Sequence, residues 1–114
     1  MPREQLESSA QPYLVNCPNP FGEPGKEKTT IIYYLKESMD VKFRIFTLTG
    51  ELVWSRDFTE GDPQTRPGLH TTDSQAVEWD GLNDRGHKVL NGVYVLVMQT
   101  DDGRVSKTKV AVVK

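Results

Sequence analysis

The sequence predicts an all-β fold, an antiparallel sandwich of about seven short strands. Short runs of β-branched and aromatic residues alternate with polar ones, and turns rich in Gly, Pro or Asx separate them. Apolar residues nowhere recur at the helical spacing over more than a turn, so no helix is expected. The 114 residues suit one domain, since a chain of this length buries roughly two-thirds of its unfolded surface.

Residues 1–12 are polar and without periodicity, and they are expected to form a flexible N-terminal linker before a domain spanning 13–114. Residues 13–17 (YLVNC) predict the first strand. The PNP sequence at 18–20 closes it, because proline cannot donate a ladder hydrogen bond. Phe21 is expected to be a buried plug.

The middle of the chain predicts three strands. Residues 28–36 alternate, with Ile31, Tyr33 and Leu35 on one face. Residues 41–45 alternate apolar with basic residues, which is typical of a strand with one wet face. Thr49 and Gly50 then make a turn, and 51–58 supply the returning strand of a hairpin.

The segment 59–74 has no apolar rhythm and is expected to be a long loop, functional or mobile. Strands are predicted at 75–79, 93–99 and 104–113, the last two joined by a Gly-closed turn. This strand spacing describes an immunoglobulin-like antiparallel β-sandwich, without the Cys–Trp–Cys pattern of antibody domains.

Composition excludes several classes of function. Sixteen acidic and fourteen basic residues nearly balance, which argues against nucleic acid as the partner. The longest apolar runs, such as 93–98, are too short for a membrane span of about 20 residues. The start MPREQLESSAQ lacks the apolar segment of a signal peptide. The chain is therefore expected to be cytoplasmic or a piece of a longer secreted protein.

Cysteine and histidine are scarce. Cys17 is the sole cysteine, which rules out an intrachain disulfide, and a structural zinc site needs four ligands. His70 and His87 lie in polar, Gly-rich contexts and are interpreted as surface residues. No nucleophile elbow and no His-Glu-x-x-His sequence occurs, so neither a catalytic residue nor a cofactor is expected.

The stretch from Trp79 to Val95 is the densest in Gly and Asx. The spacing of Gly81 and Gly86 resembles a phosphate loop, but His87 follows the second glycine where such a loop needs Lys and then Ser or Thr. The match is accidental.

Calcium is the better chemical candidate for this stretch, through Asp80, Asn83 and Asp84. Yet calcium takes about 6–8 oxygen ligands, and the EF-hand spacing is absent. The stretch is therefore interpreted as a turn in which Asx side chains cap backbone N–H groups and Trp79 plugs the sandwich.

A carbohydrate site is a further alternative, because sugar sites display exposed aromatic rings, and Trp54 and Tyr34 are its candidates. The preferred interpretation is that both belong to the core or cover a sheet.

With the strands placed, the order of motifs resembles the FlgD-type immunoglobulin-like domain, named for the flagellar hook-cap protein and found at the C-terminal end of many secreted bacterial proteins. The resemblance covers about residues 13–114, and WDG-x-N-D-x-G with G-V-Y is its most specific part. Related C-terminal sorting domains of type IX secretion share the P-N-P-F start and the T-G-x-x-V hairpin. The residues carrying the motif are Pro18, Asn19, Pro20, Phe21, Gly50, Trp79, Asp80, Gly81, Gly86, Gly92 and Tyr94.

Two departures from the family pattern lie at the sheet ends. Residues 71–76 lengthen the loop before the Trp-Asp-Gly strand, and Thr47 stands where the family often has Asp.

The resemblance implies a non-enzymatic C-terminal accessory domain, secreted or at the cell surface, that acts with protein partners in sorting, surface attachment or domain packing. One alternative is an assembly scaffold of the hook-cap kind. The other is a weak carbohydrate- or calcium-binding module. Fold-level kinship does not decide among them.

Overall fold

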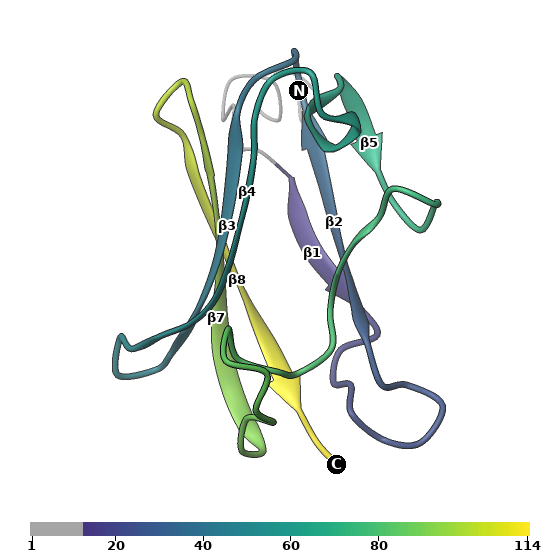
Figure 1. Cartoon of the computed structure of the whole chain (residues 1–114), viewed down its shortest axis with the longest axis vertical. Helices are drawn as coiled ribbons and strands as arrows, with labels where there is room; N and C mark the ends of the chain where they lie inside the picture. The colour runs from purple at the N-terminus through teal and green to yellow at the C-terminus, as the bar shows by residue number, and fades with distance from the viewer. Residues whose placement is uncertain (1–12) are drawn as a thin grey trace, which may run out of the picture.

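The computed structural model describes residues 13–114 and confirms the all-β prediction, as two antiparallel four-stranded sheets facing each other (Figure 1). The predicted linker 1–12 lies outside the described residues. In the first sheet β2 pairs with β1 on one side and with β5 and β6 on the other; the second sheet has the order β4-β3-β7-β8. The strands are β1 (Leu14–Cys17), β2 (Thr29–Leu35), β3 (Val41–Thr47), β4 (Leu52–Phe58), β5 (Gly68–His70), β6 (Val77–Trp79), β7 (Gly92–Thr100) and β8 (Val105–Val112).

The chain changes sheets in the PNPF motif. β1 pairs with β2 in the first sheet, whereas Phe21 forms a parallel bridge to Val112 on β8 of the second. The peptide bonds that precede Pro18 and Pro20 are both cis. One short segment therefore joins the two sheets along one side of the sandwich.

The core lies between the sheets and follows the predicted alternation. On β3 the inward residues Val41, Phe43 and Ile45 are at most 1% exposed, while Lys42 points to solvent. The buried apolar side chains are Leu14, Phe21, Ile31, Tyr33, Leu35, Val41, Phe43, Ile45, Trp54, Val77, Trp79, Tyr94, Leu96, Met98, Val110 and Val112. Each such side chain stabilises the fold by about 1.5–3 kcal/mol when fully buried.

The segment 59–74 corrects the expectation of a plain loop and raises the strand count to eight. It contains the 3₁₀ turn η1 (Pro63–Thr65) and the strand β5, which pairs with the end of β2. Three residues, Gly-Leu-His, are too few to show a period of two, so alternation could not reveal β5. Pairing with β2, which is distant in sequence, makes the strand.

Candidate functional site: the corner between β6 and β7

Trp79 pins the corner that follows β6. Its side chain is fully buried, and its indole Nε1–H donates a 2.8 Å hydrogen bond to the carbonyl oxygen of Leu82. The rings of Phe21 and Tyr94 meet it edge to face, with centroids 5.4 and 5.7 Å away. The corner is therefore anchored in the aromatic core at the junction of the PNPF motif and β7.

Asp80 and Asn83 hold the backbone of the corner. The Asp80 carboxylate accepts the N–H of Leu82 at 3.1 Å. The side-chain oxygen of Asn83 accepts the N–H groups of Arg85 and His87 at 2.9 and 3.0 Å. These are the local bonds by which Asx residues stabilise turns. Within the corner Gly81 and Gly86 have φ of 80° and 82°, values that side chains with a Cβ rarely adopt.

Asp84 fastens the corner to the free edge of β4. Its N–H donates to the carbonyl oxygen of Val53 at 3.0 Å. Its carboxylate accepts hydrogen bonds from the hydroxyl of Ser55 at 3.0 Å and from the guanidinium of Arg56 at 3.2 Å. That guanidinium lies 4.6 Å over the ring of Trp54. Part of an open sheet edge is thus occupied, which limits pairing with other chains.

The three candidate calcium ligands therefore bind different groups of the protein. The side chains of Asp80 and Asn83 accept backbone N–H groups, and that of Asp84 accepts Ser55 and Arg56. Within residues 13–114 no group of three or more His, Cys, Asp or Glu side chains is arranged to hold a metal ion. The arrangement supports a corner built on hydrogen bonds.

The PNPF segment covers the edge of β8 in a similar way. The Asn19 amide donates to the carbonyl oxygen of Lys109 at 3.1 Å and accepts the N–H of Ala111 at 2.9 Å. The backbone of Phe21 continues this pairing with Ala111 and Val113. Asn16 on β1 adds a further hydrogen bond to the same edge of β8.

Asn16 was missed by sequence reasoning, and it lies 8% exposed on β1. Its amide also donates to the carbonyl oxygen of Lys109, at 3.1 Å. The alternation of YLVNC places Asn16 on the same side of the strand as Leu14, and this was the signal that could have found it, because a buried amide needs a partner.

The remaining motif residues lie at turns and strand starts. Gly50 has φ of 99° in the β3–β4 hairpin, Gly92 begins β7, and the hydroxyl of Tyr94 donates to the carbonyl oxygen of Leu90.

Trp54 is 2% exposed, so it is a core residue, as the preferred interpretation expected, and not a sugar platform; Tyr34 is 46% exposed. The surface expectation for His70 needs correction. His70 is half-buried and stacks on Tyr33 with ring centroids 4.5 Å apart, whereas His87 is exposed as expected. The sequence did not reveal the stack, because β5 itself was not expected.

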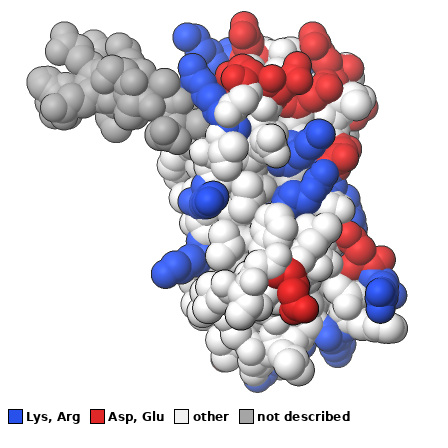
Figure 2. Space-filling view, turned by 90° about the vertical axis from the view of Figure 1, so that its left-hand side faces the viewer, with Lys and Arg blue, Asp and Glu red and all other residues white. Residues whose placement is uncertain are grey.

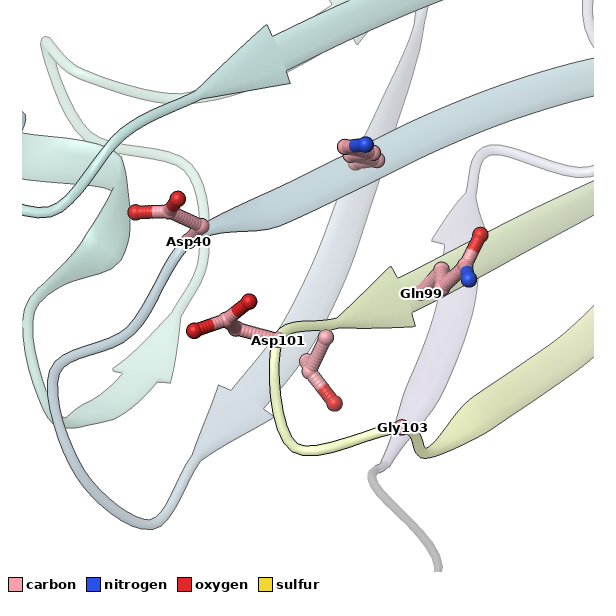
Figure 3. A pocket seen from close by; sticks show the side chains of 6 residues that line it. Asp40, Gln99, Asp101 and Gly103 are labelled. Carbon is pink, nitrogen blue, oxygen red and sulfur yellow. The ribbon is translucent and has the colours of Figure 1, made fainter.

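Acidic side chains gather at the end of the sandwich where β2, β4 and β7 finish, and basic ones spread along the outer face of the second sheet (Figure 2). An open pocket at this end has Asp40 and Asp101 among its lining residues, with Gln99 on β7 (Figure 3). The Asp40 carboxylate accepts the N–H of Glu60 at 2.7 Å. This carboxylate serves to hold the loop after β4.

The shifted pKa values of Asp57, Asp102 and Tyr33 each have a local structural cause. The Arg44 guanidinium, 2.6 Å from Asp57, lowers the pKa of that carboxyl group. The Thr100 hydroxyl lowers the pKa of Asp102 in the β7–β8 turn. Burial, with the charge of Asp73, raises the pKa of Tyr33. Each of these shifts therefore has its cause within the domain, in an ion pair, a turn or burial.

No helix within residues 13–114 has the length and apolar character needed to cross a bilayer.

No family model matches this chain. No curated protein matches it either.

Solved structures do match. PorU from Porphyromonas gingivalis, described as dimeric and latent, aligns at 23% identity and a TM-score of 0.63 over 90% of this chain and 9% of its own. PorZ, described as an essential surface component of the type IX secretion system of the same organism, aligns at 16% identity and 0.58 over 89% of this chain and 11% of its own. FlgD from Xanthomonas campestris, described in connection with flagellar hook capping, aligns at 18% identity and 0.54 over 93% of this chain and 72% of its own.

These likenesses confirm the predicted resemblance at the level of the fold. The chain spans about a tenth of PorZ and of PorU.

Proposed function

We propose that this chain is a non-catalytic C-terminal accessory domain of a secreted or cell-surface bacterial protein, with other proteins as its partners. It acts in sorting, surface attachment or domain packing. The observation that carries the proposal is the shared fold with short parts of two long proteins, one of them described as a surface component of type IX secretion.

The arrangement of the corner supports a role without catalysis. The side-chain oxygens of Asp80, Asn83 and Asp84 accept hydrogen bonds from other groups of the domain. A catalytic set needs a nucleophile or base within hydrogen-bond reach of a substrate. We therefore propose that the domain acts through contacts of its surface with other proteins.

Sorting can be tested with the whole chain fused to the C-terminus of a fluorescent reporter that is exported to the periplasm of Porphyromonas gingivalis. We expect the fusion at the cell surface, and the reporter alone inside the cell. A strain without PorZ is the control, since PorZ is described as an essential component of the system. Equal retention of fusion and reporter in the parent strain would exclude the sorting role.

An assembly scaffold is the second candidate, and the match to most of the FlgD chain favours it. The test replaces the matching region of Xanthomonas campestris FlgD with residues 13–114 and scores swimming. Restored motility would support a scaffold role. Loss of motility with normal amounts of a folded chimera would argue against it.

A further inference from the structure

The outer face of the first sheet carries a row of exposed apolar side chains. Tyr34 on β2 lies opposite Leu69 on β5, and Tyr13 lies on its other side, where its carbonyl oxygen accepts the N–H of Tyr34. Tyr13, Tyr34 and Leu69 are 51%, 46% and 59% exposed. Val15 and Ile32 form a second, half-buried row beside them. We call these five residues the tyrosine patch.

The tyrosine patch is uncharged. The strands β1, β2 and β5 contain no Lys, Arg, Asp or Glu. The outer face of the second sheet differs, because basic side chains spread over it (Figure 2). Its strands carry Lys42, Lys107 and Lys109, none of which has an ion-pair partner within residues 13–114. Contiguous exposed apolar surface is typical of interaction sites.

From this contrast we propose that the tyrosine patch is a self-association surface, on which a second copy of this chain packs with its own tyrosine patch about a two-fold axis. A contact of this type joins the same patch on both copies. The uncharged patch meets its copy without repulsion, whereas two second-sheet faces would oppose their lysines.

The charges bordering the patch complement each other in this arrangement. On β2 the patch is centred near Tyr33, between the rows of Ile32 and Tyr34. Lys36 lies three residues to one side, and Glu78, paired with Thr30, lies three residues to the other. Each is therefore about 10 Å from the centre along the strand. With the two-fold axis across the strands, each Lys36 falls near Glu78 of the other copy.

Both charges are accessible for this contact. Lys36 is exposed and makes no ion pair within residues 13–114. The side chain of Glu78 is 44% exposed, and its contact with Lys28 is 3.6 Å long. An exposed pair of this kind contributes about 0–1 kcal/mol.

The patch is small, which sets the expected affinity. Its five partly exposed side chains offer roughly 300–500 Å² per copy, against about 800 Å² per partner in a standard stable interface. The dimer should therefore be weak and form at high micromolar to millimolar concentration. Such a contact gains strength when other parts of a larger protein hold two copies close together.

Sedimentation equilibrium of the 114-residue chain, from micromolar to millimolar concentration, tests the proposal, with NMR shifts read at Ile32 and Leu69. We expect concentration-dependent dimers with shifts confined to the patch. The pair Tyr34→Ser and Leu69→Ser should weaken dimers at least about tenfold. The matched control is Leu52→Ser with Val93→Ser, which changes exposed apolar residues of the second sheet and should leave the dissociation constant unaltered.

The orientation is tested by charge exchange. Lys36→Glu alone should weaken the dimer, and Lys36→Glu with Glu78→Lys should restore it. A chain that stays monomeric at millimolar concentration would overturn the proposal and leave the patch to another protein. Dimers lost in the Leu52/Val93 control variant would also overturn it, because they would place the interface on the second sheet.

Discussion

The hydroxyl group of Tyr33 on β2 donates a 2.7 Å hydrogen bond to the main-chain carbonyl oxygen of Gln64 in η1. The same ring stacks on His70 and meets Phe43 edge to face, at centroid distances of 4.5 and 4.9 Å. One buried side chain thus ties the long connection 59–76 to both sheets. This contact explains why a segment without apolar rhythm is ordered.

Tyr33→Phe should cost about 1–2 kcal/mol of unfolding free energy, because it leaves the carbonyl of Gln64 without its donor while keeping the ring. Urea denaturation measures the loss. Tyr34→Phe is the control, since Tyr34 is half-exposed and its change should lie within about 0.5 kcal/mol. Equal effects of the two substitutions would contradict the role given to the Tyr33 hydroxyl.

The same tyrosine predicts loss of stability in alkali. Burial raises the pKa of Tyr33, with Asp73 adding to the effect. In the unfolded chain tyrosine loses its proton near pH 10. The stabilisation is therefore complete below that pH and falls as the pH rises above it. Urea midpoints of the wild type should drop more steeply above about pH 10 than those of Tyr33→Phe; parallel curves would refute the assignment.

Trp79→Ala should cost about 3–5 kcal/mol, because it empties the space between Phe21 and Tyr94. Trp79→Phe keeps a ring but removes the Nε1–H donated to Leu82, so its loss should be smaller. Chemical denaturation measures both. A cost under about 1 kcal/mol for the alanine variant is incompatible with a core tryptophan.

Gly22→Ala should destabilise more than Gly25→Ala. Both glycines have positive φ, 123° and 87°, so each alanine is strained by its backbone conformation. Only at Gly22 would the new Cβ also lie 2.7 Å from a backbone atom, the carbonyl oxygen of Val113; at Gly25 nothing lies within 4 Å. Melting temperatures of the two variants check this, and an equal loss would mean that the end of β8 shifts freely.

Calcium should not change the melting temperature between EDTA and millimolar calcium. The oxygens of Asp80, Asn83 and Asp84 already accept hydrogen bonds within the corner. A ligand that binds only the folded state must raise stability. A melting temperature that calcium raises for the wild type but not for Asp84→Ala would contradict this expectation and establish a site at the corner.

Several predictions came from local signals. Alternation placed β2, β3 and β8, the apolar run 93–99 placed β7, and turn residues placed β4, the hairpins and the corner. Phe21 and Trp79 were expected to be buried from their positions after a proline pair and at a strand end, and both are. These features follow from the preferences of neighbouring residues along the chain, which are visible in the order of residues.

Contacts between segments far apart in the chain could not be predicted from the sequence. β5 exists because β2 supplies a partner, and His70 is half-buried because Tyr33 lies beneath it. Trp54 was ambiguous because the strand register shifts between Ile45 and Phe46 in its neighbour β3. A register shift of this kind changes which side chains face the core.

By itself, then, the sequence determined the all-β class, most strand positions and the hydrogen-bonding chemistry of the Gly and Asx corner, because each depends on short-range alternation and turn preference. Only the tertiary structure decided how the sheet edges are closed and which outer face carries an uncharged apolar patch. Asn16 and Asn19 reach β8 across 93 and 90 residues, and Asp84 reaches β4. The tyrosine patch likewise needs three strands side by side. Such surfaces arise from pairing between segments far apart in the chain, which local sequence patterns do not encode.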